Sequence, residues 1–339
     1  MGRKKPGDYS HDWTPPEYTV DERGKVVGGY VPREPNNWGR WGEEDQRGAQ
    51  NLIGQAERVA AARLVTQGKV FSLALPIDAS GPRFPTRPAP LLLPLMTGSD
   101  AVVGSPYHAE DPGLQWNDDM LQMPTQGSTQ WDALAHVNYE DSMYNGWWAG
   151  NVTAQGGGRV LGVENFRQSF VGRGVLVDPA REQGLACCPD GQVIGVDLLE
   201  ACLASTGTEL RSGDILLVRT GYLAKWWELG PEDSPIDYFV SSPGLSRETV
   251  PWLHARDVSA VACDNIGVEV LVPEDPEDRT FPFHVACLVD LGLTLGEFWE
   301  LDPLAADCAE DGVYEFMLVA PPLNIPGAMG SPLNPIALK

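Results

Sequence analysis

The sequence lacks the segments that would place the protein in a membrane or outside the cell. No apolar run is long enough to span a bilayer, and the N-terminus, MGRKKPGDYSHDW, has no apolar signal segment. Basic residues are also scarce, because 24 Lys and Arg stand against 47 Asp and Glu, and the formal net charge is −23. Nucleic acids and anionic membranes are bound by basic patches. We therefore expect a cytoplasmic protein that has neither as a partner.

Several familiar catalytic motifs are missing. There is no GxGxxG and no GxxxxGK[ST], so the sequence has no phosphate-binding loop of the dinucleotide or P-loop kind. There is no GxSxG, SxxK or HExxH either, which argues against the common serine hydrolases and metalloproteases. The six cysteines form no CxxC pair and lie mostly within apolar runs, which predicts buried thiols in a reducing compartment.

Short apolar runs bounded by turn residues alternate with helical patterns along the chain. The runs predicted as strands are residues 70–77, 172–178, 213–221, 258–265 and 314–323. The segments predicted as helices are residues 57–66, 196–205, 247–256, 284–291 and about 297–308. This alternation indicates an α/β fold.

The domain organisation follows from composition. Residues 1–37 are rich in proline, glycine and charge, which predicts an arm that is extended, disordered or wrapped on a neighbour. Residues 38–339 contain no clear linker and are predicted to form a single domain. Within them, residues 78–125 are predicted as a long loop with short pieces of structure, and residues 226–246 as a lid or subunit contact.

Of the five histidines, His136 and His284 lie in apolar or aromatic surroundings and are the best candidates for chemistry. His136 ends a stretch with four polar side chains at spacings of 4, 2 and 4 residues: Gln126, Gln130, Asp132 and His136. Even spacings place side chains on one face of an extended strand. Asp132 and His136 could then hold a divalent metal or act as acid and base. In the alternative, Asp132 caps a helix that begins near residue 133, and His136 is a hydrogen-bonded core residue.

The stretch STQWDALAH resembles the signature of the metal-dependent cyclase-type hydrolases, the group that contains bacterial kynurenine formamidase and isatin hydrolase. That signature is His-x-Gly-Thr-His-x-Asp-x-Pro-x-His. Thr129, Asp132 and His136 match it, whereas Gln126 and Gln130 stand where the family has its first two histidines. The signature's glycine and proline are replaced by serine and leucine.

Further segments match in the family's order, so that the resemblance covers roughly residues 38–339. They are RWGEEDQRGAQNLI, GRGVLVD, GDILLVRTGY, DNIGVEV, FHVACLVDLGLTLGEFWELDPLA and APPLNIPGAMGSPLNPIAL. The resemblance implies one compact α/β domain with a mixed, barrel-like β-structure flanked by helices (the swivelling β/β/α type). It also implies a homo-oligomer, either a dimer or a tetramer.

The resemblance implies a metal site as well. The family binds zinc or manganese through its signature residues and a later His–Glu pair. Glutamine binds first-row metals more weakly than imidazole does, so one Mn or Zn ion per chain is expected here. The ligands implied in this sequence are Gln126, Gln130, Asp132, His284 and Glu297.

The implied activity is hydrolysis of a small cyclic or aryl amide, or of a lactone. A metal-activated water would attack the substrate carbonyl, and His136 would shuttle the proton. In a metal-free alternative, Asp132 and His136 act as an acid–base pair and the glutamines donate hydrogen bonds to a carbonyl. A biosynthetic cyclase or dehydratase is a second function for the same site. A non-catalytic binding protein is a third, because two signature histidines are absent.

Four further residues are candidates for substrate binding. Tyr144, Asn145 and Trp148 lie in NYEDSMYNGWWAG and could line a pocket for a planar substrate or form a subunit contact. Arg173 in GRGV could pair with a carboxylate of the protein or of the substrate.

Overall fold

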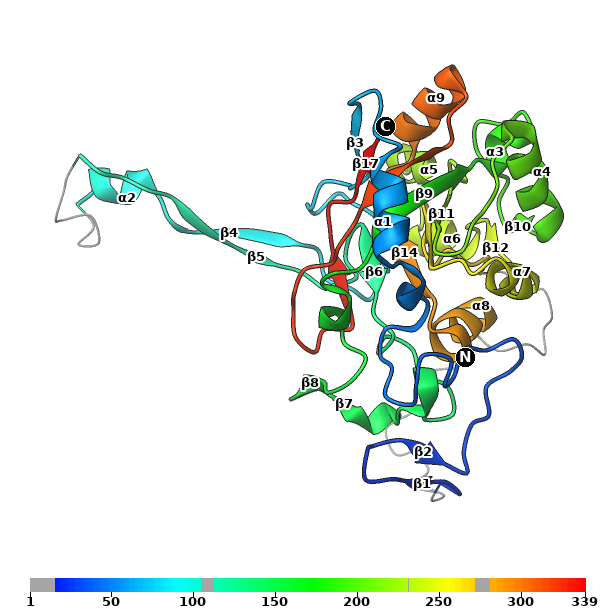
Figure 1. Cartoon of the computed structure of the whole chain (residues 1–339). Helices are drawn as coiled ribbons and strands as arrows, with labels where there is room; N and C mark the ends of the chain where they lie inside the picture. Colours follow the sequence, from blue (N-terminus) through cyan, green and yellow to red (C-terminus); the bar gives the residue numbers. More distant parts are fainter. Residues whose placement is uncertain (1–15, 105–112, 231, 272–280) are drawn as a thin grey trace.

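Three predicted strands and one unpredicted strand lie side by side in parallel at the centre of the molecule. They are β9 (Val171–Val177), β11 (Ile215–Val218), β13 (Ala260–Cys263) and β14 (Thr294–Glu297), in that order. Both faces of such strands are covered, which is why the sequences of β11 and β13 are continuous apolar runs. The computed structural model describes residues 16–104, 113–230, 232–271 and 281–339 (Figure 1).

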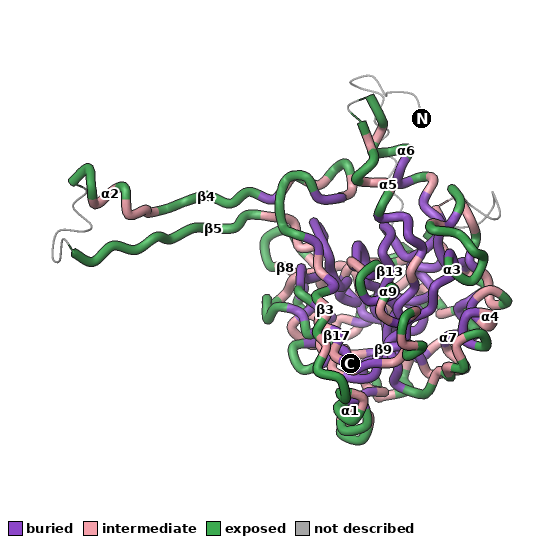
Figure 2. Tube along the Cα trace, turned by 90° about the horizontal axis from the view of Figure 1, so that it is seen from above, coloured by how far each residue is buried: buried purple, intermediate pink, exposed green. Residues whose placement is uncertain are grey.

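Antiparallel strands extend this parallel core on both sides to nine strands. β6 (Gln130–Asp132) and β16 (Gly330–Pro332) lie beyond β14, whereas β15 (Glu315–Val319), β17 (Ile336–Leu338) and β3 (Val70–Ser72) lie beyond β9. The sheet curls into a half barrel, and helices flank it. Figure 2 shows that the buried residues concentrate in this sheet and the elements packed on it. The predicted α/β fold with a mixed, barrel-like β-structure is confirmed.

The helices pack around the sheet. α1 (Gln55–Ala62) contacts β9 and β15, and α4 (Val196–Thr206) contacts β9 and α3 (Pro179–Glu182). The predicted helix at 196–205 thus forms, and it ends where Gly207 takes the left-handed conformation common at helix C-termini. The other helices are α5 (Leu223–Glu228), α6 (Pro235–Val240), α7 (Val250–Ala255), α8 (Pro282–His284), a π-helix (Val285–Leu291) and α9 (Asp302–Asp311).

The predicted helix at 297–308 is wrong in its first half. Residues 294–297 form β14, and the helix begins only at Asp302, with Pro303 in its first turn. The strand forms because Thr294, Leu295 and Gly296 pair in parallel register with β13. This tertiary pairing overrides the local helical pattern.

Residues 16–37, which belong to the predicted arm, contact the body of the same chain. They include a small hairpin of β1 (Thr19–Val20) and β2 (Val26–Val27). Lys25 Nζ donates a hydrogen bond to the carbonyl of Asn145 over 3.0 Å, and Asn37 Nδ2 donates to the carbonyl of Leu291 over 2.9 Å. Residues 1–15 of the predicted arm lie outside the described residues.

A β-hairpin projects from the body where a long loop was predicted. Its strands are β4 (Leu91–Met96) and β5 (Asp118–Gln122), and the short helix α2 (Gly98–Val102) lies toward its tip. Figures 1 and 2 show this hairpin extending away from the rest of the chain, with exposed residues along both strands. Two smaller paired sheets are β7 (Val152–Thr153) with β8 (Gly157–Gly158), and β10 (Val193–Ile194) with β12 (Gly244–Leu245).

Two predictions about the whole chain can be compared directly with the structure. All six cysteines are free thiols, and five are buried as predicted, while Cys187 is partly exposed. Across the described residues, no helix is both long and apolar enough to traverse a bilayer.

Candidate metal centre and active site

β6 places two polar side chains on one face of the sheet. Gln130 and Asp132 are two residues apart in an extended strand, so they point the same way, and both are fully buried. Trp131 points to the other face, where its ring packs 4.4 Å from the ring of Phe170 and 4.7 Å from that of Trp299, between centroids. The aromatic face anchors the strand, and the polar face is left to the candidate site. No helix begins at residue 133, where the chain instead makes a turn.

Glu297 joins this face from the neighbouring strand. β14 runs antiparallel to β6, and Glu297 is the register partner of Gln130. Gln130 Nε2 donates a hydrogen bond to Glu297 Oε2 over 2.8 Å, and both side chains are buried. The Gln130 amide therefore orients the carboxylate that faces it.

His284 completes the group from the last residue of α8, just before the π-helix. Its Nδ1 lies 2.6 Å from Glu269 Oε2, and its Nε2 lies 3.7 Å from Glu297 Oε1. The backbone N–H groups of Phe283 and His284 also donate to the Glu269 carboxylate, over 2.9 and 3.1 Å. An ionised carboxylate only accepts hydrogen bonds, so Nδ1 carries the hydrogen and Nε2 is directed toward Glu297.

Asp132, His284 and Glu297 converge in a buried cluster. One ligand-type atom from each lies within 4.8 Å of those of the other two. Both carboxylate oxygens of Asp132 and the amide oxygen of Gln130 are buried and have no hydrogen-bond partner. Buried polar atoms are nearly always satisfied, so three unsatisfied oxygens beside one cluster indicate the place of a missing ligand.

The electrostatics of the cluster follow from burial and from the neighbouring charges. Burial raises the pKa of Asp132 to about 6, with His136 opposing the rise and Glu297 adding to it. Burial alone would lower the pKa of His284, but hydrogen bonds to Glu269 and Glu297 raise it to about 10. In the protein without a bound cation, a protonated His284 balances these two carboxylates.

His136 lies at the edge of the cluster and is partly exposed. Its Nε2 is 3.8 Å from Asp132 Oδ1, and its Nδ1 is 3.4 Å from Gln126 Nε2. Gln126 is itself tied to the preceding loop, because Arg87 Nη1 donates to its carbonyl over 2.8 Å. Gly330 leaves the space for Gln126, since a Cβ there would lie 2.6 Å from Gln126 Nε2. The structure thus brings Gln130, Asp132, His284 and Glu297 together with His136 at their edge, whereas Gln126 contacts His136.

Tyr144, Asn145 and Trp148 lie elsewhere and bind the N-terminal segment. Tyr144 Oη donates to Asp45 Oδ2 over 3.1 Å, and Trp148 Nε1 donates to Tyr18 Oη over 3.0 Å. The Asn145 amide donates to three backbone carbonyls, those of Gly42, Glu43 and Asp45, and accepts from the N–H of Gly39. Their polar groups are engaged within the chain, so they do not enter our proposal for substrate binding.

Arg173 lies at the opposite end of the sheet from Glu297. Arg173 lies just before the first residue of β9 that pairs with β11. Glu297 lies just after the last residue of β14 that pairs with β13. The Arg173 guanidinium pairs with Asp214 over 2.6 Å and with Glu315 over 2.5 Å, and it borders a separate pocket of about 260 Å³. The carboxylates that it binds are therefore those of the protein, and we do not assign it to the substrate.

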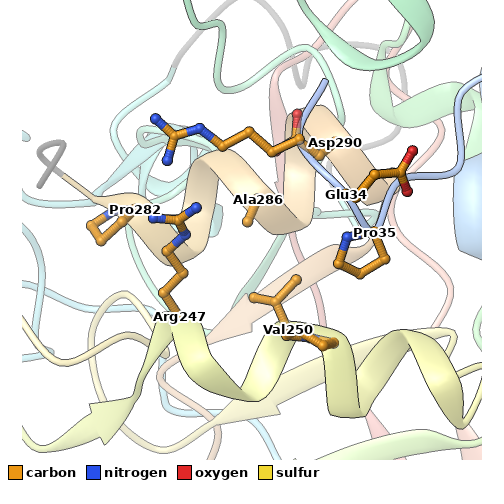
Figure 3. A pocket seen from close by; sticks show the side chains of 9 residues that line it. Glu34, Pro35, Arg247, Val250, Pro282, Ala286 and Asp290 are labelled. Carbon is orange, nitrogen blue, oxygen red and sulfur yellow. The ribbon is translucent and has the colours of Figure 1, made fainter. Parts of the chain in front are cut away.

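Another pocket, of about 90 Å³, lies beside the helix that carries His284. Figure 3 shows Pro282 of α8 and Ala286 of the π-helix opposite Arg247 and Val250, with Glu34 and Pro35 of the N-terminal segment beside them. No residue of the buried cluster lines this pocket.

Sequence reasoning missed two residues of the candidate site, Glu269 and Arg87. Glu269 could have been noticed as the one acid in the apolar segment GVEVLV. Arg87 lies in the proline-rich loop FPTRPAP, where no local pattern distinguishes it from a surface arginine. Arg87 approaches the cluster only because its loop folds back on Gln126.

The fold and this cluster can now be compared with known proteins. A family described as "Putative cyclase" matches residues 71–270. A crystal structure of a protein described as a novel cyclase is 48% identical, covers 90% of this chain and 99% of its own, and superposes with a TM-score of 0.83. The chain therefore belongs to the cyclase family. No curated protein sequence matches it significantly.

Two isatin hydrolase structures share the fold at lower identity. Isatin hydrolase A from Labrenzia aggregata, bound to benzyl benzoate, is 18% identical, with a TM-score of 0.55 and coverage of 79% of this chain and 93% of its own. An isatin hydrolase bound to the product analogue thioisatinate is 19% identical, with a TM-score of 0.56 and coverage of 85% and 99%. At these identities the likeness concerns the fold alone.

Proposed function

We propose that this protein is a divalent-metal-dependent hydrolase of a small cyclic or aryl amide, or of a lactone. The observation that carries the proposal is the buried cluster of Asp132, His284 and Glu297 beside three buried oxygens that have no hydrogen-bond partner. Two carboxylates, one imidazole and one amide oxygen are ligands that suit Mn²⁺ or Zn²⁺. The residues present therefore fit such an ion.

The metal ligands are Asp132, His284 and Glu297, with Gln130 adding its amide oxygen or holding Glu297 in place. Gln126 is assigned to His136 instead, because its Nε2 lies 3.4 Å from Nδ1 of that ring. When bound, the metal supplies Lewis acidity for a substrate carbonyl and for water. One ion per chain is expected, since glutamines stand at two positions where the family has histidines.

His136 is the proton carrier of the proposed reaction. It is partly exposed beside the cluster, within reach of both water and substrate. It takes one proton from the attacking water as the new C–O bond forms. It then gives that proton to the leaving nitrogen or oxygen as the C–N or C–O bond breaks. Asp132 Oδ1 lies 3.8 Å from Nε2 of this imidazole.

A cyclase or dehydratase without a metal is the second candidate function. It is favoured by the geometry of His284, whose Nδ1 lies 2.6 Å from Glu269 Oε2 and whose Nε2 lies 3.7 Å from Glu297 Oε1, because an imidazolium there balances both buried carboxylates without a metal ion. In that case Asp132 and His136 act as acid and base, and the substrate gains no water.

Metal content and product mass test the proposal together. We expect about one Mn or Zn per chain in protein purified without chelator, measured by elemental mass spectrometry. Asp132→Ala should lose the metal, whereas His136→Ala should keep it and lower kcat by about 10²–10⁴-fold, the usual contribution of a general acid–base group. Asp197→Ala, at an exposed position of α4, is the matched control. A panel of cyclic amides, aryl formamides and lactones should yield products heavier by one water.

The opposite results decide against the hydrolase. A wild-type protein that takes up no metal from Mn²⁺ or Zn²⁺ solutions, and whose product has not gained a water, would establish the metal-free alternative. Equal metal content in wild type and Asp132→Ala would remove the cluster from the metal site.

A further inference from the structure

One arginine of the proline-rich loop before β4 lies at the edge of the candidate active site. Arg87 is half-buried, and its Nη1 donates to the backbone carbonyl of Gln126 over 2.8 Å. The side-chain Nε2 of the same glutamine lies 3.4 Å from His136 Nδ1. The guanidinium and the proposed proton carrier are therefore held at the two ends of a single residue.

The loop that carries Arg87 is fixed by contacts with the body. Trp226 Nε1 donates to the carbonyl of Ser80 over 2.8 Å, and the ring of Phe84 stacks 6.0 Å from that of Phe239, between centroids. Four prolines between residues 82 and 90 restrict the backbone further. Arg87 is thus placed before any ligand arrives, which lowers the entropy lost on binding.

Most of the hydrogen-bonding capacity of Arg87 is left over by the protein. Among the described residues, the carbonyl of Gln126 is the one acceptor for its five guanidinium N–H donors, and no carboxylate pairs with it. Its charge nevertheless acts on the cluster. Burial raises the pKa of the Asp132 and Glu297 carboxyls, and the positive charge of Arg87 is among the effects that lower it. A ligand that reaches the cluster therefore comes within range of Arg87.

Aromatic surface lies directly beside this guanidinium. The Arg87 Cζ atom is 5.9 Å from the centre of the Phe84 ring. Phe84 and Trp226 both stack on Phe239, and both are partly exposed. An aromatic ring that carries a negative charge matches both the apolar surface and the cation.

We propose that Arg87 is a specificity-determining residue of the hydrolase proposed above, on which this role rests, and that it binds a carboxylate carried by the aromatic ring of the substrate. A guanidinium matches a carboxylate through two parallel N–H···O bonds. The scissile amide or lactone carbonyl then lies at the cluster of Asp132, His284 and Glu297. Two anchoring points fix the substrate relative to His136.

The surrounding charge explains why such a substrate needs an arginine. Asp132, Glu269 and Glu297 are buried acids of the site, and the whole chain has a net charge of −23. An anionic ligand is repelled by this field unless a local cation offsets it. Holding the loop to Gln126 requires only one N–H of Arg87, so that contact alone does not account for a guanidinium here.

Isothermal titration with two ligands of the same shape tests this role. Phthalamate (2-carbamoylbenzoate) carries one carboxylate, and phthalamide has a neutral amide in its place. We expect the wild type to bind phthalamate about 10–100-fold more tightly, the usual range for charge-assisted hydrogen bonds. Arg87→Met should remove this preference, and Arg87→Lys should keep part of it. Arg63→Met, at an exposed position after α1, is the matched control and should keep all of it.

The ratio of the two affinities separates Arg87 from its neighbours. A carboxylate bound only by a metal keeps its advantage in Arg87→Met, and a loop held only by Arg87 weakens both ligands equally. Either result, or a wild type without preference, would overturn the proposal. Circular dichroism checks that each variant is folded.

Metal content and product mass, measured on the same samples, keep this test apart from that of the proposed function. A preference that depends on Arg87, in a protein that holds no metal and adds no water, would reject the hydrolase and retain the carboxylate site. Bound metal and hydrolysis without such a preference would reject the role of Arg87 alone.

Discussion

At the residue scale, the candidate site depends on the buried carboxylate of Glu269, which is not one of the proposed metal ligands. Glu269 accepts three hydrogen bonds from the α8 region: two from backbone N–H groups and one from His284 Nδ1. Val268 before it takes a positive φ of 58°, and Asn265 Oδ1 accepts from the N–H of Val268, so the turn that presents Glu269 is held in place. Partners of this kind commonly set the orientation of metal-binding histidines.

Glu269→Gln should weaken metal binding without unfolding the protein. The amide keeps the volume of the side chain but loses the charge that fixes the protonated Nδ1 of His284. We expect Mn²⁺ or Zn²⁺ affinity to fall by about 10–100-fold, the usual effect of losing such a partner. Isothermal titration with each metal measures this change.

Glu248→Gln, an exposed position, is the control for this substitution and should leave affinity unchanged. Circular dichroism should show the same fold in both variants. Equal affinity in wild type and Glu269→Gln would mean that Glu269 only supports the backbone of α8. If the wild type binds no metal at all, the failure lies with the proposed function and not with Glu269.

At the element scale, β17 is tied to α9 by one buried lysine. Lys339 Nζ donates to Asp307 Oδ2 over 2.9 Å and to Asp311 Oδ1 over 2.7 Å, and the side chain is almost fully buried. Gln67 Nε2 donates to the other oxygen of Asp311 over 2.9 Å. Partial burial alone would raise the pKa of Asp311, but these hydrogen bonds lower it to about 2.

The stability contributed by Asp311 should be lost in acid. Its ordinary pKa is 3.8 and its folded value is about 2, so the stabilisation is complete above about pH 4 and disappears as the pH falls to about 2. Asp311→Asn should therefore be less stable than the wild type at pH 7. The difference in urea midpoint should shrink between pH 4 and pH 2.

Glu310→Gln is the control, because Glu310 is exposed on the same helix. Its difference from the wild type should be small and should not follow the same pH window. A difference for Asp311→Asn that stays constant from pH 7 to pH 2 would show that Lys339 does not stabilise the ionised form.

At the scale of the whole molecule, the excess of negative charge destabilises the folded state. With 47 acidic and 24 basic side chains, the net charge of −23 produces mutual repulsion in the folded state. Salt shortens the range of this repulsion, from a Debye length of about 30 Å at 0.01 M to about 8 Å at 0.15 M. Screening therefore weakens the repulsion that opposes folding.

The melting temperature should therefore rise by about 1–2 °C between about 0.01 M and 0.15 M NaCl, a shift that corresponds to roughly 1 kcal/mol for a protein of this size. Choline chloride should act equally, because screening does not depend on the cation. Chelator is present throughout, so that metal binding does not contribute. A melting temperature that falls with salt would show that attractive ion pairs outweigh the net repulsion.

Local patterns were sufficient for much of the fold. The runs that became β9, β11, β13 and β15 are apolar and bounded by turn residues, and such runs form buried strands wherever a sheet is available. Within the signature stretch, only residues 130–132 form the extended strand that the even spacings predicted. The two-residue spacing of Gln130 and Asp132 places both side chains on one face of β6, whatever lies beside it.

The sequence by itself thus determined the α/β class, the strand that presents Asp132, and His136 and His284 as candidates, because these depend on residue types and short spacings. Only the tertiary structure decided that Glu297 ends a strand opposite Gln130, that Glu269 holds His284, and that Arg173 lies at the far end of the sheet. It also turned a proline-rich loop into a projecting hairpin. Each of these depends on register between strands or contact between segments far apart in the chain, and the energy of such pairings comes from packing that no local pattern encodes.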